Sequence, residues 1–577
     1  MQTIPPLRWI ARGNPFHPGE AGSNGAFPAI LEQLILQRGL PEGVGLEDYL
    51  NPKLKTLMDP LLIPDMAPAV ERILQAVDRK ERVCIFGDYD VDGVTSVTLL
   101  RRILLAYGLE SRYFIPKRGV EGYGLSEAAL ERCMREGPVP ELLITVDCGT
   151  VSVAEVAGLR ARGIDVVIVD HHEPLPGERP DCTALVNPKC GENFTYLCAA
   201  GVVFKLGHAL LKTRPAEFDL RTVLDLVAVA TISDIVPMIG ENRLLVRHGL
   251  KMLAHTSNPG LRALQQVTGM SGEVSSMDVG FRIGPRLNAA GRMDQPDKAL
   301  ELLITDDPEE AMALARELDG HNRERQTHEL LIRRQALEML NGFDPTRDPV
   351  IVLGSREWHP GVVGIVASRL MRQFYKPTFV VAIDGQGKGK GSGRSIAGVS
   401  LVEAIRDCNG DLDAGGGHAM AAGISVSEEK LDQFRQHFGE YVMATTSEEQ
   451  RLPRLYFDAE VGFDQLSLEF LESYELLQPF GSQNPQPVFV SRGVNLSRPP
   501  LRMKNNHLRL TLRQGLPELD AVFFGGGETQ LPDPPWDVAF TVDRNTFRGR
   551  TALQLVIQDV RAAVTGPDGT ARQSALP

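Results

Sequence analysis

Residues 83–93 read VCIFGDYDVDG, and this stretch decides the fold of the first half of the chain. Its first four residues are apolar and have the length of a buried strand. A turn with three carboxylates follows, and helical stretches then alternate with further short apolar runs. Short apolar strands separated by helices are typical of a parallel sheet that is covered on both faces.

The same arrangement recurs along the chain. The apolar run 142–146 leads into Asp147, and the run 166–169 leads into Asp170, His171 and His172. The apolar stretch that ends at Ile232 leads into Ser233 and Asp234. Because ligand sites of open parallel sheets lie at the carboxyl ends of the strands, we expect these groups to converge in one crevice.

Converging carboxylates repel one another unless a cation neutralises them. Carboxylates with imidazole suit Mn²⁺ or Mg²⁺, and the histidine favours Mn²⁺. The ligand count is enough for two ions ~4 Å apart, which would activate water and stabilise the oxyanions of a phosphoryl displacement. A single Asp at a strand end is more often a turn or helix cap, and D-x-D-x-D also resembles a calcium loop. Glu is absent at the twelfth position of that loop, and the four segments together favour a metal site.

These motifs resemble those of the DHH phosphoesterase superfamily, which is named after its Asp-His-His triplet. Residues 88–93, Asp147, the triplet at 170–172 and Asp234 match its successive motifs, and GGGHAMAAG at 415–423 looks like the signature of the DHH-associated domain. GPRLNAAGR at 284–292 and WHPGVVG at 358–364 are similar to segments of one branch, the RecJ single-strand-specific exonucleases. The resemblance runs from about residue 50 to the end, and the first residues carry no usable motif.

The resemblance implies a role for each matched residue. Asp90 and Asp147 would bind one metal ion, and Asp147 would bridge to the second. The other ligands of the second ion would be Asp92, His171 and Asp234.

Three further residues of these motifs have roles that the resemblance implies less directly. Asp88 would be a metal ligand or lie just outside the ligands. His172 would face the scissile phosphate. Asp170 would orient a histidine or cap a helix.

Candidate phosphate-binding residues lie in a glycine-rich stretch at 385–393 and just after it. These residues are Lys388, Lys390, Ser392 and Arg394. The glycines between them would let backbone amides approach an anion. A plain hairpin is the alternative for this stretch. His418 is either a structural turn residue or a substrate contact, and the resemblance favours contact.

A second group of candidate substrate residues lies in the segment 284–292. Arg286 and Arg292 flank Asn288 in what we expect to be a non-helical segment bounded by Gly and Pro. A solvated loop is the alternative to the nucleic-acid backbone contact that the resemblance implies. Arg118 is a weaker candidate for contact with the 5′ end of a strand.

The predicted fold class is α/β, with a catalytic domain on a parallel sheet, linking helices, a smaller second α/β domain and a C-terminal β-barrel of the OB type. One long or broken helix is expected at 307–341, and another from Pro360 to about Gln373. We place the boundaries as follows: an N-terminal segment at 1–52, the DHH catalytic domain at 53–245, a helical linker at 246–345, the DHH-associated domain at 346–450, the OB-like domain at 451–565 and a flexible tail at 566–577.

The C-terminal β-rich region offers a candidate single-strand-binding surface. Basic residues cluster around one hairpin: Arg502, Lys504, His507, Arg509 and Arg513. Phe523, Phe524 and Phe547 are available for base stacking, although core packing is the more common role of a Phe.

Composition limits the class of protein. The chain has 577 residues, with 61 Lys and Arg against 74 Asp and Glu, a net charge of −13. This balance argues against a protein surface that is basic overall, but it allows a local basic groove. No apolar run approaches the ~18 residues of a membrane span, and the N-terminus lacks a secretory signal. Seven cysteines without a C-x-x-C pair favour a reducing cytoplasm.

The resemblance therefore implies an exonuclease that degrades single-stranded DNA from the 5′ end to mononucleotides, with two Mn²⁺ or Mg²⁺ ions. It further implies roles in DNA recombination and repair alongside a helicase and a single-strand-binding protein. Two alternatives stay open: a phosphodiesterase acting on short oligonucleotides or cyclic dinucleotides, and a DNA-binding scaffold with a degenerate core.

Overall fold

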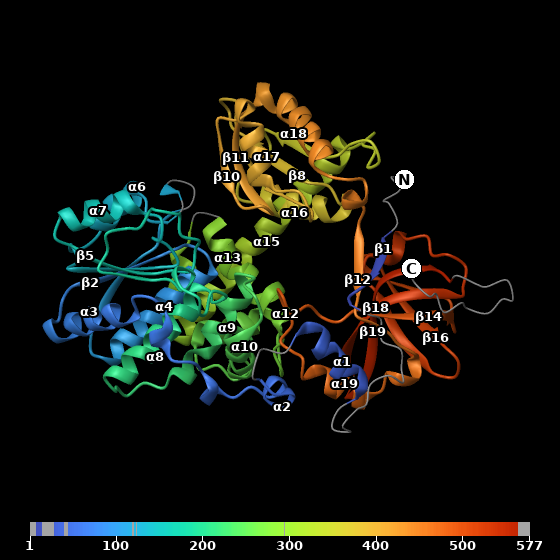
Figure 1. The fold of residues 1–577 in the computed structure, drawn as a ribbon, viewed down its shortest axis with the longest axis horizontal. Coiled ribbons are helices and arrows are strands. Elements are labelled where there is room, and N and C mark those ends of the chain that lie inside the picture. The colour runs from blue at the N-terminus through green and yellow to red at the C-terminus, as the bar shows by residue number, and fades with distance from the viewer. Residues whose placement is uncertain are drawn as a thin grey trace.

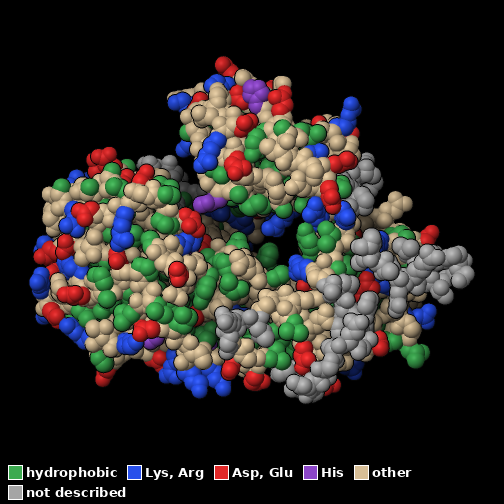
Figure 2. Space-filling model, in the orientation of Figure 1, with side chains coloured by type: hydrophobic (Ala, Val, Ile, Leu, Met, Phe, Trp, Pro, Cys, Tyr) green, Lys and Arg blue, Asp and Glu red, His purple; other side chains and the backbone are tan. Residues whose placement is uncertain are grey.

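The computed structural model describes residues 7–13, 28–39, 44–117, 121–122, 124–292, 295–547 and 549–563. Figure 1 shows three lobes arranged in a ring, and the space-filling view in Figure 2 shows a central opening between them. We call residues 54–339 the first lobe, 351–445 the second lobe, and 8–50 together with 454–562 the third lobe. No helix of the described residues is long and apolar enough to cross a membrane.

The first lobe is built on a five-stranded sheet in the order β3-β2-β4-β5-β6, and every pairing in it is parallel. The strands are β2 (Val83–Gly87), β3 (Ser111–Phe114), β4 (Leu142–Val146), β5 (Asp165–Val169) and β6 (Ala184–Val186). The helices beside the sheet are α3 (Met66–Arg79), α4 (Val91–Ala106), α6 (Glu127–Arg135), α7 (Val153–Ala161) and α8 (Ala199–Thr213). The expected parallel sheet is confirmed.

Both faces of this sheet are buried because successive strand residues point to opposite sides. Ile85 and Ile144 pack with α3, α4 and α8, whereas Phe86 and Leu143 pack with α6 and α7. Figure 1 shows the two helical layers on either side of the sheet. Continuous apolar strands are what such a double cover requires.

The helices after the sheet extend the same hydrophobic core as far as the first half of α15. They are α9 (Leu224–Ser233), α10 (Gly240–Leu253), α11 (Pro259–Val267), α12 (Ser276–Asp278), the π-helix η5 (Val279–Ile283), α13 (Gly284–Arg292), α14 (Asp297–Ile304) and α15 (Pro308–Met339). The long helix expected at 307–341 is thus one continuous helix. The expectation of a non-helical segment at 284–292 is wrong, because the buried Leu287 and Ala290 of α13 pack into this core.

The second lobe has a five-stranded sheet in the order β10-β11-β9-β8-β7. Its elements are β7 (Ile351–Ser355), α16 (Val363–Phe374), β8 (Thr378–Ile383), β9 (Lys388–Arg394), α17 (Leu401–Asp407), β10 (Ala414–Gly417), β11 (Ala421–Ser427) and α18 (Leu431–Thr445). Strands β7 and β8 are parallel and the other pairs are antiparallel. The second α/β unit is confirmed.

One local expectation in the second lobe is wrong, and one alternative is decided in favour of a hairpin. The helix starts at Val363 and not at Pro360, because residues 359–362 form a turn in which the N–H of Gly361 donates to Nδ1 of His359 at 3.1 Å. The glycine-rich stretch is largely the strand β9, which pairs with both β8 and β11. Its backbone amides take part in the hydrogen bonds of the sheet, so binding of an anion would depend on the side chains of β9.

The third lobe is a seven-stranded sheet in the order β13-β14-β18-β19-β17-β16-β15, and an additional β14–β16 pairing brings its ends together as a barrel. Its elements are β12 (Arg454–Phe457), β13 (Ala459–Glu460), α19 (Leu468–Glu475), β14 (Phe489–Leu496), β15 (Leu501–Met503), β16 (His507–Arg513), β17 (Glu518–Phe523), β18 (Trp536–Phe547) and β19 (Arg550–Ala562). The N-terminal elements β1 (Arg8–Ala11), α1 (Ala29–Arg38) and α2 (Leu46–Leu50) also belong to this lobe, where Leu31 and Ile35 enter the core of the barrel. The flexible tail expected at 566–577 lies outside the described residues.

Candidate metal centre

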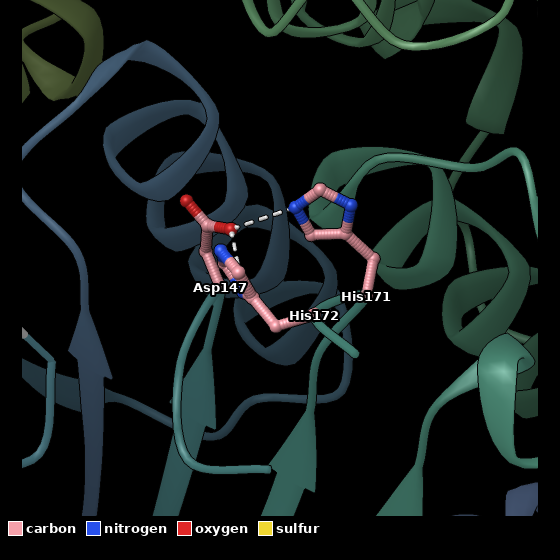
Figure 3. A group of neighbouring side chains, drawn as sticks. All are labelled: Asp147, His171 and His172. Atoms are coloured by element: carbon pink, nitrogen blue, oxygen red, sulfur yellow. Dashed lines mark ion pairs between the residues drawn. The ribbon is translucent and has the colours of Figure 1, made fainter. Parts of the chain in front are cut away.

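The acidic and histidine residues of the sequence motifs meet at the carboxyl ends of the central strands. Asp88 follows β2, Asp147 follows β4, and the triplet 170–172 follows β5. Figure 3 shows Asp147 and the two histidines turned toward one another above the strands. Asp234 also reaches this cluster, but it follows the buried helix α9 and not a strand.

His171 lies at the centre of the cluster. Its Nε2 is 3.2 Å from Oδ1 of Asp147, 3.6 Å from Oδ2 of Asp234 and 3.7 Å from Oδ2 of Asp92. Three groups of residues result, and the potential ligand atoms of each group lie within 4.8 Å of one another. Their members are Asp88, Asp90 and Asp147; Asp92, His171 and Asp234; and Asp147, His171 and His172. Asp147 belongs to two groups, as a bridging carboxylate would.

Local backbone features hold the carboxylates in place. Oδ2 and Oδ1 of Asp92 accept hydrogen bonds at 2.6 and 2.8 Å from the N–H groups of Ala199 and Ala200, at the start of α8. Asp90 caps α4 by accepting from the N–H of Gly93 at 3.0 Å. A Cβ at Gly93 would lie 2.3 Å from the carbonyl oxygen of Asp88, so only glycine lets the turn close this tightly.

The cluster has the electrostatics of a cation site. Burial, followed by repulsion from Asp92 and Asp90, raises the pKa of Asp147 well above its usual range. Burial and neighbouring carboxylates raise the pKa of Asp92 to about 7 and that of Asp234 to about 8. Burial and the charge of His172 lower the pKa of His171 to about 4, so its imidazole is neutral, as a metal ligand must be. Oxygen donors with one neutral imidazole fit Mn²⁺ or Mg²⁺.

Asp170 has a different role from the other carboxylates. Oδ1 lies 2.7 Å from Nδ1 of His172 and accepts from the backbone N–H of His171 and His172, while Oδ2 accepts from Thr150. Burial alone would raise the pKa of Asp170, but its bonds to His172 and the nearby histidines lower it. Burial opposes protonation of His172, yet the bond to Asp170 and the surrounding carboxylates raise its pKa to about 9. Asp170 thus orients a protonated His172.

Three family models match the chain. The DHH family N-terminal domain matches residues 82–231, the DHHA1 domain matches 347–444, and the RecJ OB domain matches 457–559. The single-stranded-DNA-specific exonuclease RecJ of Bacillus subtilis is 38% identical over 541 residues, which cover 92% of this chain and 67% of that protein. The RecJ of Dickeya dadantii is 36% identical over 562 residues, covering 92% of this chain and 96% of that protein.

The chain belongs to the RecJ family.

Solved RecJ structures agree with this assignment. The crystal structure of RecJ from Thermus thermophilus in complex with Mn²⁺ has a TM-score of 0.82 at 31% identity, covering 97% of this chain and 80% of that chain. The complex of the same protein with Mg²⁺ has a TM-score of 0.77 at 30% identity and covers 97% and 79%. The α/β lobes and the OB-type barrel expected from the sequence are therefore those of the RecJ fold.

The candidate substrate residues are distributed over the lobes that border the central opening. Figure 2 shows Lys and Arg side chains on the side of the second lobe that faces this opening. On β9, Nη1 of Arg394 lies 3.2 Å from Oγ of Ser392, so these two candidates are adjacent. His418 is exposed at the turn between β10 and β11. Arg118 lies outside the described residues.

The residues of α13 lie where the first and second lobes meet. Nη1 of Arg292 donates to the carbonyl of Gly361 at 3.0 Å. Gly291 packs so closely on the metal-binding turn that a Cβ there would be 2.9 Å from the carbonyl oxygen of Tyr89. Arg286 is instead ion-paired with Asp319 of α15 at 2.8 Å, and Asn288 is half-buried. In this RecJ-family chain Arg292 is thus beside the metal centre, while Arg286 joins two helices.

Asn187 is a site residue that sequence reasoning missed. Its side-chain amide donates to the carbonyl of His172 at 2.8 Å and to Oγ1 of Thr150 at 2.9 Å, and it is fully buried. It therefore fixes the loop that carries the histidines. The available signal was its position directly after the short apolar run 184–186, the same pattern as in the other motif residues.

Proposed function

We propose that this protein is a metal-dependent exonuclease that degrades single-stranded DNA from the 5′ end and releases 5′-mononucleotides. The observation that carries this proposal is the buried cluster of carboxylates around the neutral His171. Family membership and the OB-type lobe support single-stranded DNA as the substrate class.

The geometry supports a proposed role for each residue. Asp88, Asp90, Asp92, Asp147, His171 and Asp234 would hold two divalent cations, Mn²⁺ or Mg²⁺. Bound there, the cations would supply an activated water and charge stabilisation at the scissile phosphate. His172, kept protonated by Asp170, would donate a hydrogen bond to a phosphate oxygen.

Substrate binding would use groups from more than one lobe. Ser392, Arg394 and His418 would contact phosphates from the second lobe, and Arg292 from the junction between lobes. Arg118, Arg286 and Asn288 complete the proposed set. In the third lobe, Phe524 is 60% exposed beside His507 and available to a base, whereas Phe523 packs against the barrel core. The side chain of Phe547 is not among those described.

The domain boundaries given above and the biological setting are part of the proposal. We place the protein in the cytoplasm, where all seven cysteines would stay as the free thiols observed. A role in recombination and repair, beside a helicase and a single-strand-binding protein, rests on the family resemblance. Cleavage of short oligonucleotides or cyclic dinucleotides is the second candidate, since the same metal centre could perform it. The OB-type lobe favours the longer substrate.

A labelled-strand assay tests the proposed function. Purified protein and Mn²⁺ are mixed with single-stranded DNA of about 30 nucleotides, long enough to span an OB-type site. One sample carries a label at the 5′ end and another at the 3′ end, with matched duplex as the control. We expect immediate release of a labelled mononucleotide from the 5′-labelled strand, a shortening ladder from the 3′-labelled strand and intact duplex.

The other outcomes identify the alternatives. Intact long strands with cleaved dinucleotides would support the small-substrate phosphodiesterase. No hydrolysis of any phosphodiester would support the DNA-binding scaffold. The variant Asp147→Asn serves as the control for contaminating nucleases.

A further inference from the structure

The helix that delivers Asp234 to the metal centre ends in an unusual way. Asp234 is the C-cap of α9, and Ile235 follows it with a φ of 60°, in the left-handed region. Helices commonly stop with such a residue, but it is normally glycine because a Cβ is unfavourable there. Of the described non-glycine residues with positive φ, Ile235 is the one with a β-branched side chain. That combination is a genuine backbone outlier.

Packing within the chain does not explain the isoleucine. Its side chain is 73% exposed, so burial of its methyl groups does not compensate for the backbone strain. Strained residues persist where function requires them and cluster at binding and catalytic sites. Ile235 is covalently next to Asp234, a proposed metal ligand.

A second exposed apolar side chain flanks the same helix end. Phe281 is 71% exposed and lies in the π-helix η5, between the fully buried Val279 and Ile283. π-Helices are rare and occur frequently at functional sites.

The π-helix packs directly on the last turn of α9. A Cβ on Gly280 would be 3.9 Å from Cγ2 of Ile232, and a Cβ on Gly284 would be 2.7 Å from Oγ of Ser233. Helix α12, immediately before η5, lies at the edge of the first lobe that faces the third lobe (Figure 1). Phe281 and Ile235 therefore stand on adjacent segments, and Ile235 directly follows the proposed metal ligand Asp234.

We propose that Ile235 and Phe281 form an apolar shelf that receives a nucleobase of the substrate strand beside the scissile phosphate. This inference rests on the proposed function, to which it adds a means of distinguishing single-stranded from duplex DNA. An unpaired base offers an apolar face for stacking on an aromatic ring. In a duplex that face is already stacked and the base is paired, so the shelf favours single strands. Phe281 and Ile235 are positioning residues for the substrate and take no part in the chemistry.

The test compares two 5′-phosphorylated single strands of the same length. The second strand lacks the bases of its terminal nucleotides and is otherwise identical to the first. Stacking of one base corresponds to about a tenfold preference in kcat/KM for the base-bearing strand. We expect the wild-type protein to show this preference, Phe281→Ala and Ile235→Gly to bring it close to unity, and Phe281→Trp to keep it. Ile235→Gly should unfold at the same or a higher temperature, because glycine accepts the left-handed conformation.

Matched variants control for the two kinds of change. Lys80 also has a positive φ, 52°, at the end of α3, and Lys80→Gly should leave the preference intact. Leu105, 40% exposed on α4, provides the control Leu105→Ala for loss of an exposed apolar side chain.

Two results would overturn the shelf: a wild-type protein indifferent to the missing bases, or a preference that survives in both Phe281→Ala and Ile235→Gly. If the wild-type protein hydrolyses neither strand, the proposed exonuclease function fails. The shelf is then judged by the ratio of the two dissociation constants, measured by fluorescence anisotropy in EDTA with the same variants.

Discussion

At the scale of single residues, Asp147 shows that the metal-free centre is destabilised by its own buried charges. Its φ of 63° turns the chain sharply after β4, and its side chain is almost completely buried among other carboxylates. Burying like charges together is unfavourable in the absence of a cation, which is why the pKa of Asp147 is raised. The site therefore carries a local cost that divalent ions would remove.

Asp147→Asn should have opposite effects on activity and on the stability of the metal-free protein. Loss of the shared carboxylate should reduce Mn²⁺-dependent turnover by at least about 100-fold, more than loss of a residue that merely supports a ligand. In EDTA the variant should unfold at the same or a higher urea concentration, because one source of repulsion is gone. Turnover and urea unfolding measure the two effects, and near-wild-type turnover would exclude the bridging role.

The affinity for Mn²⁺ should rise with pH. Asp92 and Asp234, with pKa values raised to about 7 and about 8, are partly protonated near neutral pH in the metal-free protein. Metal binding requires the deprotonated forms, so protons compete at low pH and the affinity increases as pH rises through this range. The increase should reach about tenfold per pH unit for each proton released. Titration calorimetry from about pH 6 to about pH 9 measures it, and a pH-independent affinity would contradict the assigned ligands.

At the scale of secondary-structure elements, the contact between α16 and β9 sets the position of the proposed phosphate-binding side chains. Gly364, near the start of α16, faces β9 closely. A Cβ there would lie 2.8 Å from Oγ of Ser392 and 3.4 Å from Nη2 of Arg394. The helix and the strand thus leave no space for a larger residue behind this pair.

Gly364→Ala should displace Ser392 and Arg394 and raise KM for single-stranded DNA several-fold, while Mn²⁺ affinity stays unchanged. Gly158→Ala on α7 is the matched control, because a Cβ there meets no atom within 4 Å. The control should stabilise the protein by about 0.5–1 kcal/mol through helix propensity, with unchanged KM. Equal loss of metal and DNA affinity in Gly364→Ala would contradict a specific role in phosphate binding.

At the scale of the whole molecule, described segments that are far apart in the sequence join in one lobe. β1 pairs in parallel with β12, and Nε1 of Trp9 donates to Asp559 at 2.7 Å. Helix α10 then ties this lobe to the first. Nη1 and Nη2 of the buried Arg243 donate to the carbonyls of Tyr49 and Leu476 at 2.5 and 2.7 Å. One side chain thus holds the N-terminal segment, the third lobe and the first lobe together.

Arg243→Met should lower the free energy of unfolding by about 2–4 kcal/mol, because the carbonyl of Tyr49 loses a charged donor and that of Leu476 keeps only the bond from Arg247. The third lobe should then unfold at a lower urea concentration than the first, seen as two transitions by tryptophan fluorescence and circular dichroism. Arg221→Met is the control. Arg221 is exposed and pairs with Asp219 at the surface, and its loss should leave the free energy of unfolding nearly unchanged. Equal stability of the two variants would show that Arg243 does not couple the lobes.

The sequence by itself determined the parallel sheet, the order of the lobes and the set of metal-binding candidates. Strand length, alternation and turn position are local properties, and motif residues at strand ends must converge wherever parallel strands lie side by side.

Only the tertiary structure decided the features that depend on contacts between distant segments. The segment 284–292 has the Gly and Pro of a loop, yet it is a helix because its apolar residues enter a core made by other segments. The place of the N-terminal residues depends on segments at the far end of the chain: α1 packs into the core of the barrel, and β1 pairs with β12 in a separate two-stranded sheet. Asp170 would either orient a histidine or cap a helix on the sequence alone, and its hydrogen bonds to His172 and Thr150 decide for the histidine. Such contacts depend on how whole elements pack, which no short stretch of sequence encodes.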